Sequence, residues 1–205
     1  MTKTVETTLN PLLLLLTMNT AKNRLIELIK KRSFKMTEEP SFHLSSGGMS
    51  RFYFNMKPVT HSPEGLTLIG KLYLDKLNEL GIRPISVGGL TMGADPIADA
   101  IAMASFTRQP AIEAFVIRKE PKQHGMKLQL EGYVKPGDTA LIIDDVVTTG
   151  ASTIKAIEIA EEFGVKILAV IVLVNRCEQN GMENISRRGY PTYSILNIED
   201  FIGQK

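Results

Sequence analysis

The chain has 205 residues, of which 43% are hydrophobic and 22% charged, enough for one sizeable hydrophobic core. Its 24 Lys and Arg nearly balance its 22 Asp and Glu, so no overall field favours nucleic acid or a membrane surface, and any anion site must be local. Cys177 is the only cysteine, which excludes an intramolecular disulfide and indicates a reducing compartment, the cytoplasm.

An apolar run at residues 12–16 stands out near the N-terminus. It is far shorter than the roughly 20 apolar residues that cross a bilayer. Lys3 and Glu6 precede it and no convincing cleavage site follows, which disfavours a secretory signal. We expect this segment to pack on the body of the protein or on a partner subunit.

A helix and a hairpin are predicted next. Asn19 or Thr20 can cap a helix that ends in the basic stretch 30–35, which we expect to be a solvated helix end. Residues 41–44 and 51–56 alternate aromatic or apolar with polar residues around a Gly-containing turn. This pattern is typical of two strands joined as a hairpin.

A long helix is predicted after the hairpin. Ser62 is a suitable N-cap, Pro63 suits the first helical position and Gly81 would stop the helix. Beyond it, apolar and helical patterns alternate. Strands are expected at residues 85–88, 111–118, 139–143 and 167–174, and helices at 96–106 and 152–163.

The predicted fold class is α/β, a doubly wound, mostly parallel sheet, because continuous apolar strands separated by helices indicate right-handed crossovers. We expect residues 61–205 to form this core and residues 1–60 a small N-terminal hood of helix plus β-hairpin. Ligands of such sheets bind beyond the carboxyl ends of the strands. The loops at that edge would begin at Gly88, Arg118, Asp144 and Asn175.

The most informative segment is 141–152, where a buried strand ends in Asp144 and Asp145 and a loop of small hydroxylic residues leads into a helix. Backbone N–H groups of residues 148–152 and the helix dipole would cradle a phosphate dianion. Carboxylates accept hydrogen bonds and a ribose diol donates them, so acids beside an anion site indicate a sugar phosphate. Walker A and dinucleotide-fold patterns are absent from the segment. The alternative is a capped helix beside two solvated acids.

This arrangement resembles the phosphoribosyl pyrophosphate signature of the type I phosphoribosyltransferase family. The resemblance implies that the two acids contact the ribose hydroxyls and that residues 148–152 hold the 5′-phosphate. The residues it assigns to phosphoribosyl pyrophosphate are Asp144, Asp145, Val146, Val147, Thr148, Thr149, Gly150, Ala151 and Ser152.

Residues 118–125 place three permanent cations and a histidine after a strand expected beside this motif. They would suit a pyrophosphate leaving group that gains charge as the anomeric C–O bond breaks, although an exposed basic loop would look the same. The segment resembles the catalytic loop of the orotate branch of the family, which closes partly onto the other subunit of a dimer. The resemblance implies that Arg118, Lys119, Lys122 and His124 bind phosphoribosyl pyrophosphate, and that Lys119, Lys122 and His124 are catalytic.

Residues 46–57 resemble the hood hairpin of the orotate branch, whose aromatic pair stacks on the base. Tyr53 and Phe54 fill those positions, but aromatic residues that serve only as core would give the same pattern.

Arg176 follows the last long strand, and the resemblance implies that it binds the carboxylate of orotate, a task that suits a planar guanidinium. The alternative is a surface ion pair with Glu178. Thr148 is the other orotate contact that the resemblance implies.

The chain departs from several relatives of the orotate branch. Ser45 and Gly93 stand where a lysine is frequent, and Asn175 stands where aspartate is common. Residues 88–96 resemble the loop at which pyrophosphate approaches the backbone closely. Cys177 is expected to be a buried or half-buried thiol without a role.

The resemblance implies a pentosyltransferase that joins orotate to 5-phospho-α-D-ribose 1-diphosphate, giving orotidine 5′-phosphate and diphosphate in pyrimidine nucleotide synthesis. It implies Mg²⁺ held mainly by the substrate, with Asp144 and Asp145 reaching it directly or through water, and a homodimer with shared sites. No nucleic acid or membrane partner is expected. Three alternatives are a transferase for a purine or other base, a regulator that senses phosphoribosyl pyrophosphate, and a structural α/β domain, which would leave the acids and the basic loop unexplained.

Overall fold

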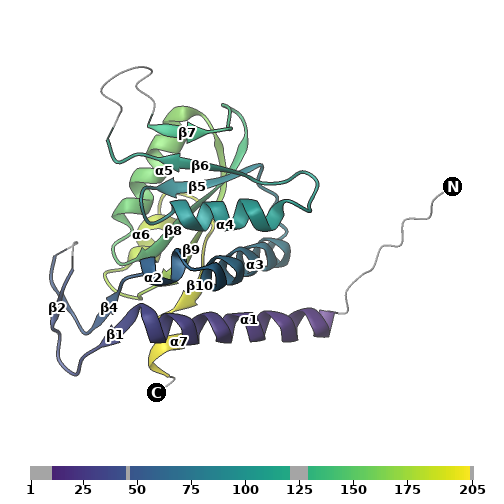
Figure 1. The fold of residues 1–205 in the computed structure, drawn as a ribbon. Coiled ribbons are helices and arrows are strands. Elements are labelled where there is room, and N and C mark those ends of the chain that lie inside the picture. The colour runs from purple at the N-terminus through teal and green to yellow at the C-terminus, as the bar shows by residue number, and fades with distance from the viewer. Residues whose placement is uncertain (1–10, 45–46, 121–128, 204–205) are drawn as a thin grey trace.

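The computed structural model describes residues 11–44, 47–120 and 129–203 (Figure 1). Its main sheet has six strands in the order β10-β9-β8-β5-β6-β7. Five strands run parallel, and β7 pairs antiparallel with β6. The strands are β5 (Ser86–Leu90), β6 (Glu113–Ile117), β7 (Leu130–Gly132), β8 (Thr139–Val147), β9 (Lys166–Asn175) and β10 (Thr192–Asn197). The predicted doubly wound, mostly parallel sheet is confirmed.

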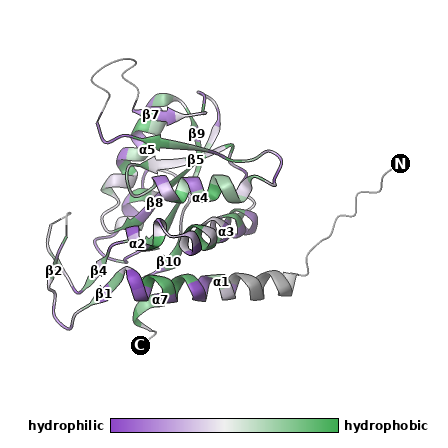
Figure 2. Ribbon diagram, in the orientation of Figure 1, coloured by the Kyte–Doolittle hydropathy of each residue, from purple (hydrophilic) through white to green (hydrophobic). Residues whose placement is uncertain are grey.

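Helices cover both faces of the sheet, with α3 and α4 on one face and α5 on the other (Figure 1). They are α1 (Pro11–Arg32), α2 (Lys57–Thr60), α3 (Pro63–Leu80), α4 (Asp95–Ser105), α5 (Ala151–Phe163), α6 (Gly181–Ser186) and α7 (Glu199–Ile202). Strand β8 shows how both faces are filled, since Leu141 and Ile143 join the cluster of α3 and α4, whereas Ala140 and Ile142 join that of α5. In Figure 2 the central strands are coloured mostly as hydrophobic residues.

The limits predicted for α3 are confirmed. The Ser62 hydroxyl accepts a hydrogen bond from Gly65 N at 3.1 Å, and Pro63 is the first helical residue. Gly81 ends the helix with a φ of 67°, a conformation that glycine adopts without steric cost. Capping chemistry is local, which is why the sequence predicts it well.

Helix α1 begins at Pro11, so the caps expected at Asn19 and Thr20 are wrong and both residues lie inside the helix. Leucine has high helix propensity, and the buried Leu25 and Ile29 pack with Ile69 in one cluster, which extends the helix past weak capping residues. The packing expected for the apolar run lies outside the described side chains. Leu25 of the predicted hood and Ile69 of the predicted core share that cluster, so the two parts pack together. The division of the chain at residue 60 stays a prediction.

The hood contains two short strand pairs, so the predicted hairpin is only partly right. Strand β2 (Phe42–His43) pairs with β3 (Met49–Ser50), whereas β4 (Phe52–Phe54) pairs with β1 (Phe34–Met36). The sequence around β1 was expected to be the end of a helix. Contact of Phe34 with both Phe54 and Phe201, at centroid distances of 4.9 and 5.3 Å, decides the pairing instead.

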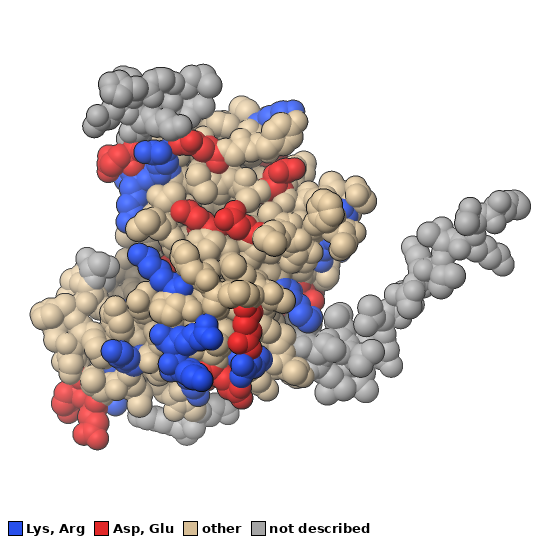
Figure 3. Space-filling model, viewed as in Figure 1, with Lys and Arg blue, Asp and Glu red and all other residues tan. Residues whose placement is uncertain are grey.

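Charges on the visible face are of both signs and are interspersed, with Lys and Arg side chains gathered over α1 (Figure 3). The last turn of α1 supplies the exposed Lys30, Lys31 and Arg32, the solvated basic helix end that the sequence predicts. In the described part of the chain, no helix has both the length and the apolar character needed to span a membrane.

Gly70 marks the closest approach of α3 to α4 and can be tested. A Cβ on Gly70 would lie 2.4 Å from Ala100 O, so the helices would have to separate. Helix propensity alone would favour alanine by about 1 kcal/mol, but overpacking costs about 1–3 kcal/mol. We expect Gly70→Ala to lower the free energy of unfolding in urea titrations. Asn78→Ala, on the exposed side of α3, should not lower it, and equal stabilisation by both variants would contradict the close packing.

Candidate active site

Four parallel strands end at one edge of the sheet. Their register pairs Leu90 of β5 with Ile117 of β6, and Val147 of β8 with Asn175 of β9. The loops expected to carry the site therefore leave from a single edge, as predicted. One detail differs, because β8 continues to Val147 and its acids lie within the strand rather than after it.

Asp144 is buried, with 4% of its surface exposed. Its Oδ2 accepts hydrogen bonds from Ser152 Oγ at 2.8 Å and from Thr153 Oγ1 at 2.6 Å, and its Oδ1 accepts one from Asp145 N at 3.0 Å. The carboxylate thus ties the first turn of α5 to the end of β8. The Ser152 hydroxyl, expected to donate to phosphate, donates to Asp144. The contact of Asp144 with ribose stays a prediction.

Asp145 is the acid with capacity left for a ligand. Its Oδ1 accepts a hydrogen bond from Val146 N at 2.9 Å, and a Cβ on Gly93 would lie 2.5 Å from that oxygen. Burial, followed by the charge of Asp144, raises the pKa of Asp145 to about 7. A cation or hydroxyl donors would stabilise the ionised carboxylate. Any side chain at position 93 would contact this carboxylate.

The loop before α5 is the segment for which the sequence analysis predicts phosphate binding, and its geometry suits that prediction without testing it. Gly150, with a φ of 81°, is the N-cap residue of α5 and provides no side-chain cap. Of the first-turn amides, Ala151 N donates to Thr149 Oγ1 at 3.3 Å. The amides of the first turn and the positive end of the helix dipole therefore suit a dianion. Helix α6 supports this loop from behind, because Asn184 Nδ2 donates to Thr149 O at 3.0 Å, and a Cβ on Gly150 would lie 2.8 Å from Gly181 O.

The remaining predicted phosphate-loop residues divide between core and surface. Val146 and Val147 pack with the hydrophobic clusters on opposite faces of the sheet, so their backbones rather than their side chains are available to a ligand. Thr148 and Thr149 are partly buried, and Ala151 is exposed at the start of α5.

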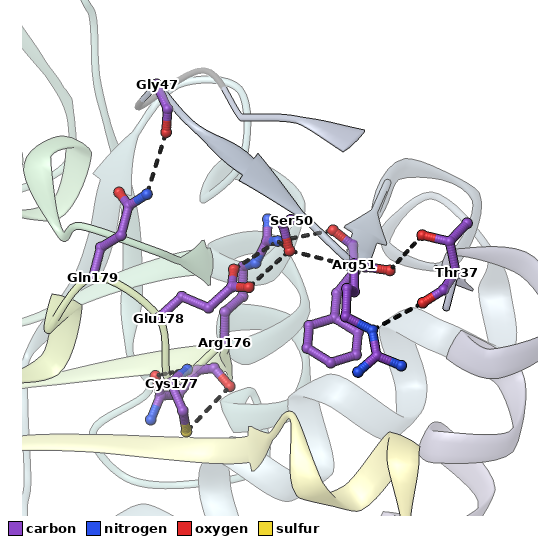
Figure 4. A network of polar contacts seen from close by, with 10 residues as sticks. Thr37, Gly47, Ser50, Arg51, Arg176, Cys177, Glu178 and Gln179 are labelled. Carbon is purple, nitrogen blue, oxygen red and sulfur yellow. Dashed lines mark hydrogen bonds and ion pairs between the residues drawn. The ribbon is translucent and has the colours of Figure 1, made fainter. Parts of the chain in front are cut away.

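Arg176 is nearly buried, with 6% exposed, and joins β9 to the hood (Figure 4). Its Nη2 donates to Ser50 Oγ and to Phe52 O, both at 2.8 Å, and lies 2.8 Å from Glu178 Oε2. Burial lowers the pKa of Arg176, and the charge of Glu178 opposes this shift. The ion pair with Glu178 considered from the sequence is present, but it is not a surface pair, because Arg176 is buried beside the hood and Glu178 is partly buried.

The two hood aromatics lie on opposite faces of β4, as neighbouring strand residues do. Phe54 packs on Phe34 and lies beside Arg176, whose Cζ is 5.9 Å from the ring centroid. Tyr53 is 42% exposed and packs on Phe42 at 5.4 Å. The structure therefore brings Phe54, and not Tyr53, next to the guanidinium.

The stem of the basic loop is held on α5. Arg118 and Lys119 are exposed, and Lys119 O accepts a hydrogen bond from Lys155 Nζ at 2.7 Å. Arg118 Nη1 lies 3.5 Å from Glu131 Oε1. Lys122 and His124, which were predicted to complete the loop, lie outside the described residues.

Several residues of the site escape the sequence analysis. Ser50 and Asn184 contact Arg176 and the phosphate loop, respectively. Residues 46–50 have the pattern Ser-Gly-x-x-Ser, which could have indicated a role for Ser50. No local pattern distinguishes Asn184. Cys177 was expected to be at least half-buried, and it is exposed, because the chain turns away from the sheet directly after Arg176.

Comparison with known proteins agrees with this geometry. Residues 56–203 match the family model of the phosphoribosyl transferase domain. The orotate phosphoribosyltransferase of Aquifex aeolicus is 46% identical over 181 residues, covering 88% of this chain and 97% of that protein. The corresponding protein of Rhodopseudomonas palustris is 39% identical, covering 90% and 97%.

Solved structures give the same result. The crystal structure of Mycobacterium tuberculosis orotate phosphoribosyltransferase with Fe(III) dicitrate has a TM-score of 0.75 and 32% identity, covering 90% of this chain and 99% of that one. The complex with 5-phospho-α-D-ribosyl 1-diphosphate has a TM-score of 0.71 and 27% identity, covering 89% and 92%. These matches agree with the phosphoribosyltransferase class that the fold and the site define. Within that class, the chain belongs to the orotate phosphoribosyltransferase family.

The raised pKa of Asp145 predicts a pH-dependent effect of Asp145→Asn. The folded, ligand-free protein holds this proton more tightly than the unfolded chain, whose Asp pKa is near 3.8. The contribution of Asp145 to the free energy of unfolding of the wild type therefore falls as the pH rises from about 4 to about 7. Asparagine does not ionise, so the variant should gain stability relative to wild type between pH 5 and pH 8, measured by urea unfolding without ligands. A stability difference that is equal at both pH values would contradict the shift.

Proposed function

We propose that the protein transfers the phosphoribosyl group of 5-phospho-α-D-ribose 1-diphosphate to orotate, forming orotidine 5′-phosphate and diphosphate in pyrimidine nucleotide synthesis. The observation that carries this proposal is the buried guanidinium of Arg176 beneath the hood, at the same sheet edge as the start of α5. A guanidinium binds a base that carries a carboxylate and gives no comparable advantage to a purine. We place the enzyme in the cytoplasm, since its single cysteine suits a reducing compartment.

The substrate would lie along this edge with its 5′-phosphate on the amides of residues 148–152 and its ribose diol on Asp145, with Asp144 behind it. Arg176 and Thr148 would hold orotate, with Phe54 against the guanidinium and Tyr53 at the rim. The ring nitrogen of orotate is acidic enough to attack as an anion, so no strong base is needed. A bond forms from this nitrogen to the anomeric carbon as the bond to the diphosphate oxygen breaks. Alignment of these atoms is the main catalytic task.

The leaving diphosphate gathers negative charge as it departs. Lys119, with Lys122 and His124 from the same loop and Arg118 at its stem, would stabilise that charge through hydrogen bonds that strengthen in the transition state. The stem is exposed and anchored by Lys155, which suits a segment that closes over bound substrate and excludes water.

Mg²⁺ fits the residues present. The raised pKa of Asp145 indicates a carboxylate whose charge lacks compensation, and Mg²⁺ prefers such oxygen ligands. Among the described residues, no group of three or more His, Cys, Asp or Glu side chains could hold a metal ion alone. We therefore propose that substrate oxygens hold Mg²⁺, with Asp145 and Asp144 reaching it directly or through water. Bound there, the ion would neutralise charge on the diphosphate.

A spectrophotometric assay tests the function. Purified protein with phosphoribosyl pyrophosphate and Mg²⁺ should consume orotate but not uracil, hypoxanthine or adenine. Turnover of a purine instead of orotate would refute the proposed substrate, and no turnover of any base would favour the sensing regulator.

Lys119→Ala tests the leaving-group role. Loss of a charged donor to a developing oxyanion costs roughly a hundredfold or more in kcat, while the KM for orotate should change little. Lys166→Ala is the matched control, because Lys166 is exposed at the other end of β9. An unchanged kcat in Lys119→Ala would show that the role is wrong.

We further propose a homodimer in which the basic loop of one subunit completes the site of the other. Lys119→Ala and Arg176→Ala should each be inactive, yet a mixture allowed to exchange subunits should recover up to about a quarter of wild-type activity, because half of random dimers are hybrids with one intact site. Recovery should fall on dilution. A mixture without recovery would place the loop and the guanidinium of each site in one subunit.

A further inference from the structure

The guanidinium of Arg176 already faces a carboxylate in the ligand-free protein. Glu178 Oε2 lies 2.8 Å from Nη2, while Glu178 Oε1 accepts the Ser50 hydroxyl at 2.7 Å. Ser50 Oγ in turn accepts a hydrogen bond from Arg176 Nη2 at 2.8 Å. Figure 4 shows this triangle between the hood and the segment after β9. The carboxylate of Glu178 therefore lies against the guanidinium of Arg176, which the proposed function assigns to the carboxylate of orotate.

The contact between the two charges is incomplete. Within the described residues, neither Nε of Arg176 nor Oε2 of Glu178 has a hydrogen-bond partner, although both are buried. The short Nη2 to Oε2 distance thus gives charge attraction without hydrogen-bond geometry. Buried charged groups with unused hydrogen-bonding capacity raise the free energy of the protein. A ligand that satisfies them better can replace the contact.

The backbone between and after the two residues is bent to hold Glu178 there. Cys177, Gln179 and Asn180 all have positive φ angles, of 52°, 53° and 54°. Residues other than glycine adopt this left-handed conformation at an energetic cost, which is smaller for asparagine than for most others. Gln179 Nε2 donates to Gly47 O at 3.2 Å, so this bent segment is also fastened to the hood. The fold maintains an unfavourable backbone that returns an acid onto Arg176.

We propose that Glu178 sets the affinity for the base as a resident carboxylate, which neutralises Arg176 in the empty site and is displaced from Nη2 by the carboxylate of orotate. The inference rests on the proposed function, since it takes Arg176 as the orotate ligand. Glu178 would keep the Ser50 hydroxyl as it moves. This exchange of carboxylates on Arg176 would discriminate among bases. A base without a carboxylate would displace the negative charge of Glu178 and supply none in its place.

Glu178→Gln separates this role from a purely structural one. Glutamine still accepts the Ser50 hydroxyl but does not compete for the positive charge. The KM for orotate should fall about tenfold, equivalent to about 1.4 kcal/mol, whereas the KM for phosphoribosyl pyrophosphate should stay within about twofold. If Glu178 only held Arg176 in position, the KM for orotate would rise. A rise or no change would overturn the proposal.

Two further measurements complete the test. Glu183→Gln makes the same charge change on the exposed surface of α6, and it should alter neither KM. A crystal structure of wild type with orotate should show Glu178 Oε2 withdrawn from Arg176, and an unchanged contact of 2.8 Å would overturn the proposal even if the variant did not fold. Wild type that fails to consume orotate would refute the proposed function, whereas active wild type with an unaffected variant would refute only this inference.

Discussion

The hydrogen bonds from Ser152 and Thr153 to the buried Asp144 are the constraint on which the site depends. They fix the start of α5 against the last residues of β8, and so they decide where the amides of the first turn of α5 point. Asp144 is occupied in this way, whereas its neighbour Asp145 is partly buried and accepts only the Val146 amide on its Oδ1. One acid braces the start of α5 and the other does not, although the two are adjacent in sequence.

A second constraint joins the two halves of the site. The segment after β9 contacts the hood through Arg176 and Gln179, and it contacts the phosphate loop through Asn184 Nδ2, which donates to Thr149 O. A segment of nine residues, from Arg176 to Asn184, therefore connects the hood with the loop before α5.

The ligand-free site is electrostatically unfavourable in two places. Asp145 is a carboxylate beside another carboxylate, with a raised pKa, and Arg176 and Glu178 form a buried pair with unused hydrogen-bonding atoms. Such arrangements lower stability and persist where binding relieves them. A substrate with a diol, a metal-bound diphosphate and a carboxylate supplies what each of these groups lacks.

The sequence by itself determined the parallel sheet, the ends of α3 and the family to which the segment 141–152 points, because apolar runs, caps and glycines act over a few neighbouring residues. It did not determine that β4 would pair with β1, that Tyr53 and Phe54 would separate, or that Asp144 would serve as a brace. The contacts of Ser50 with Arg176 and Glu178 join residues 126 and 128 positions apart. Only the tertiary structure decides such contacts, because they depend on how the hood lies across the end of β9, and no local pattern encodes that placement.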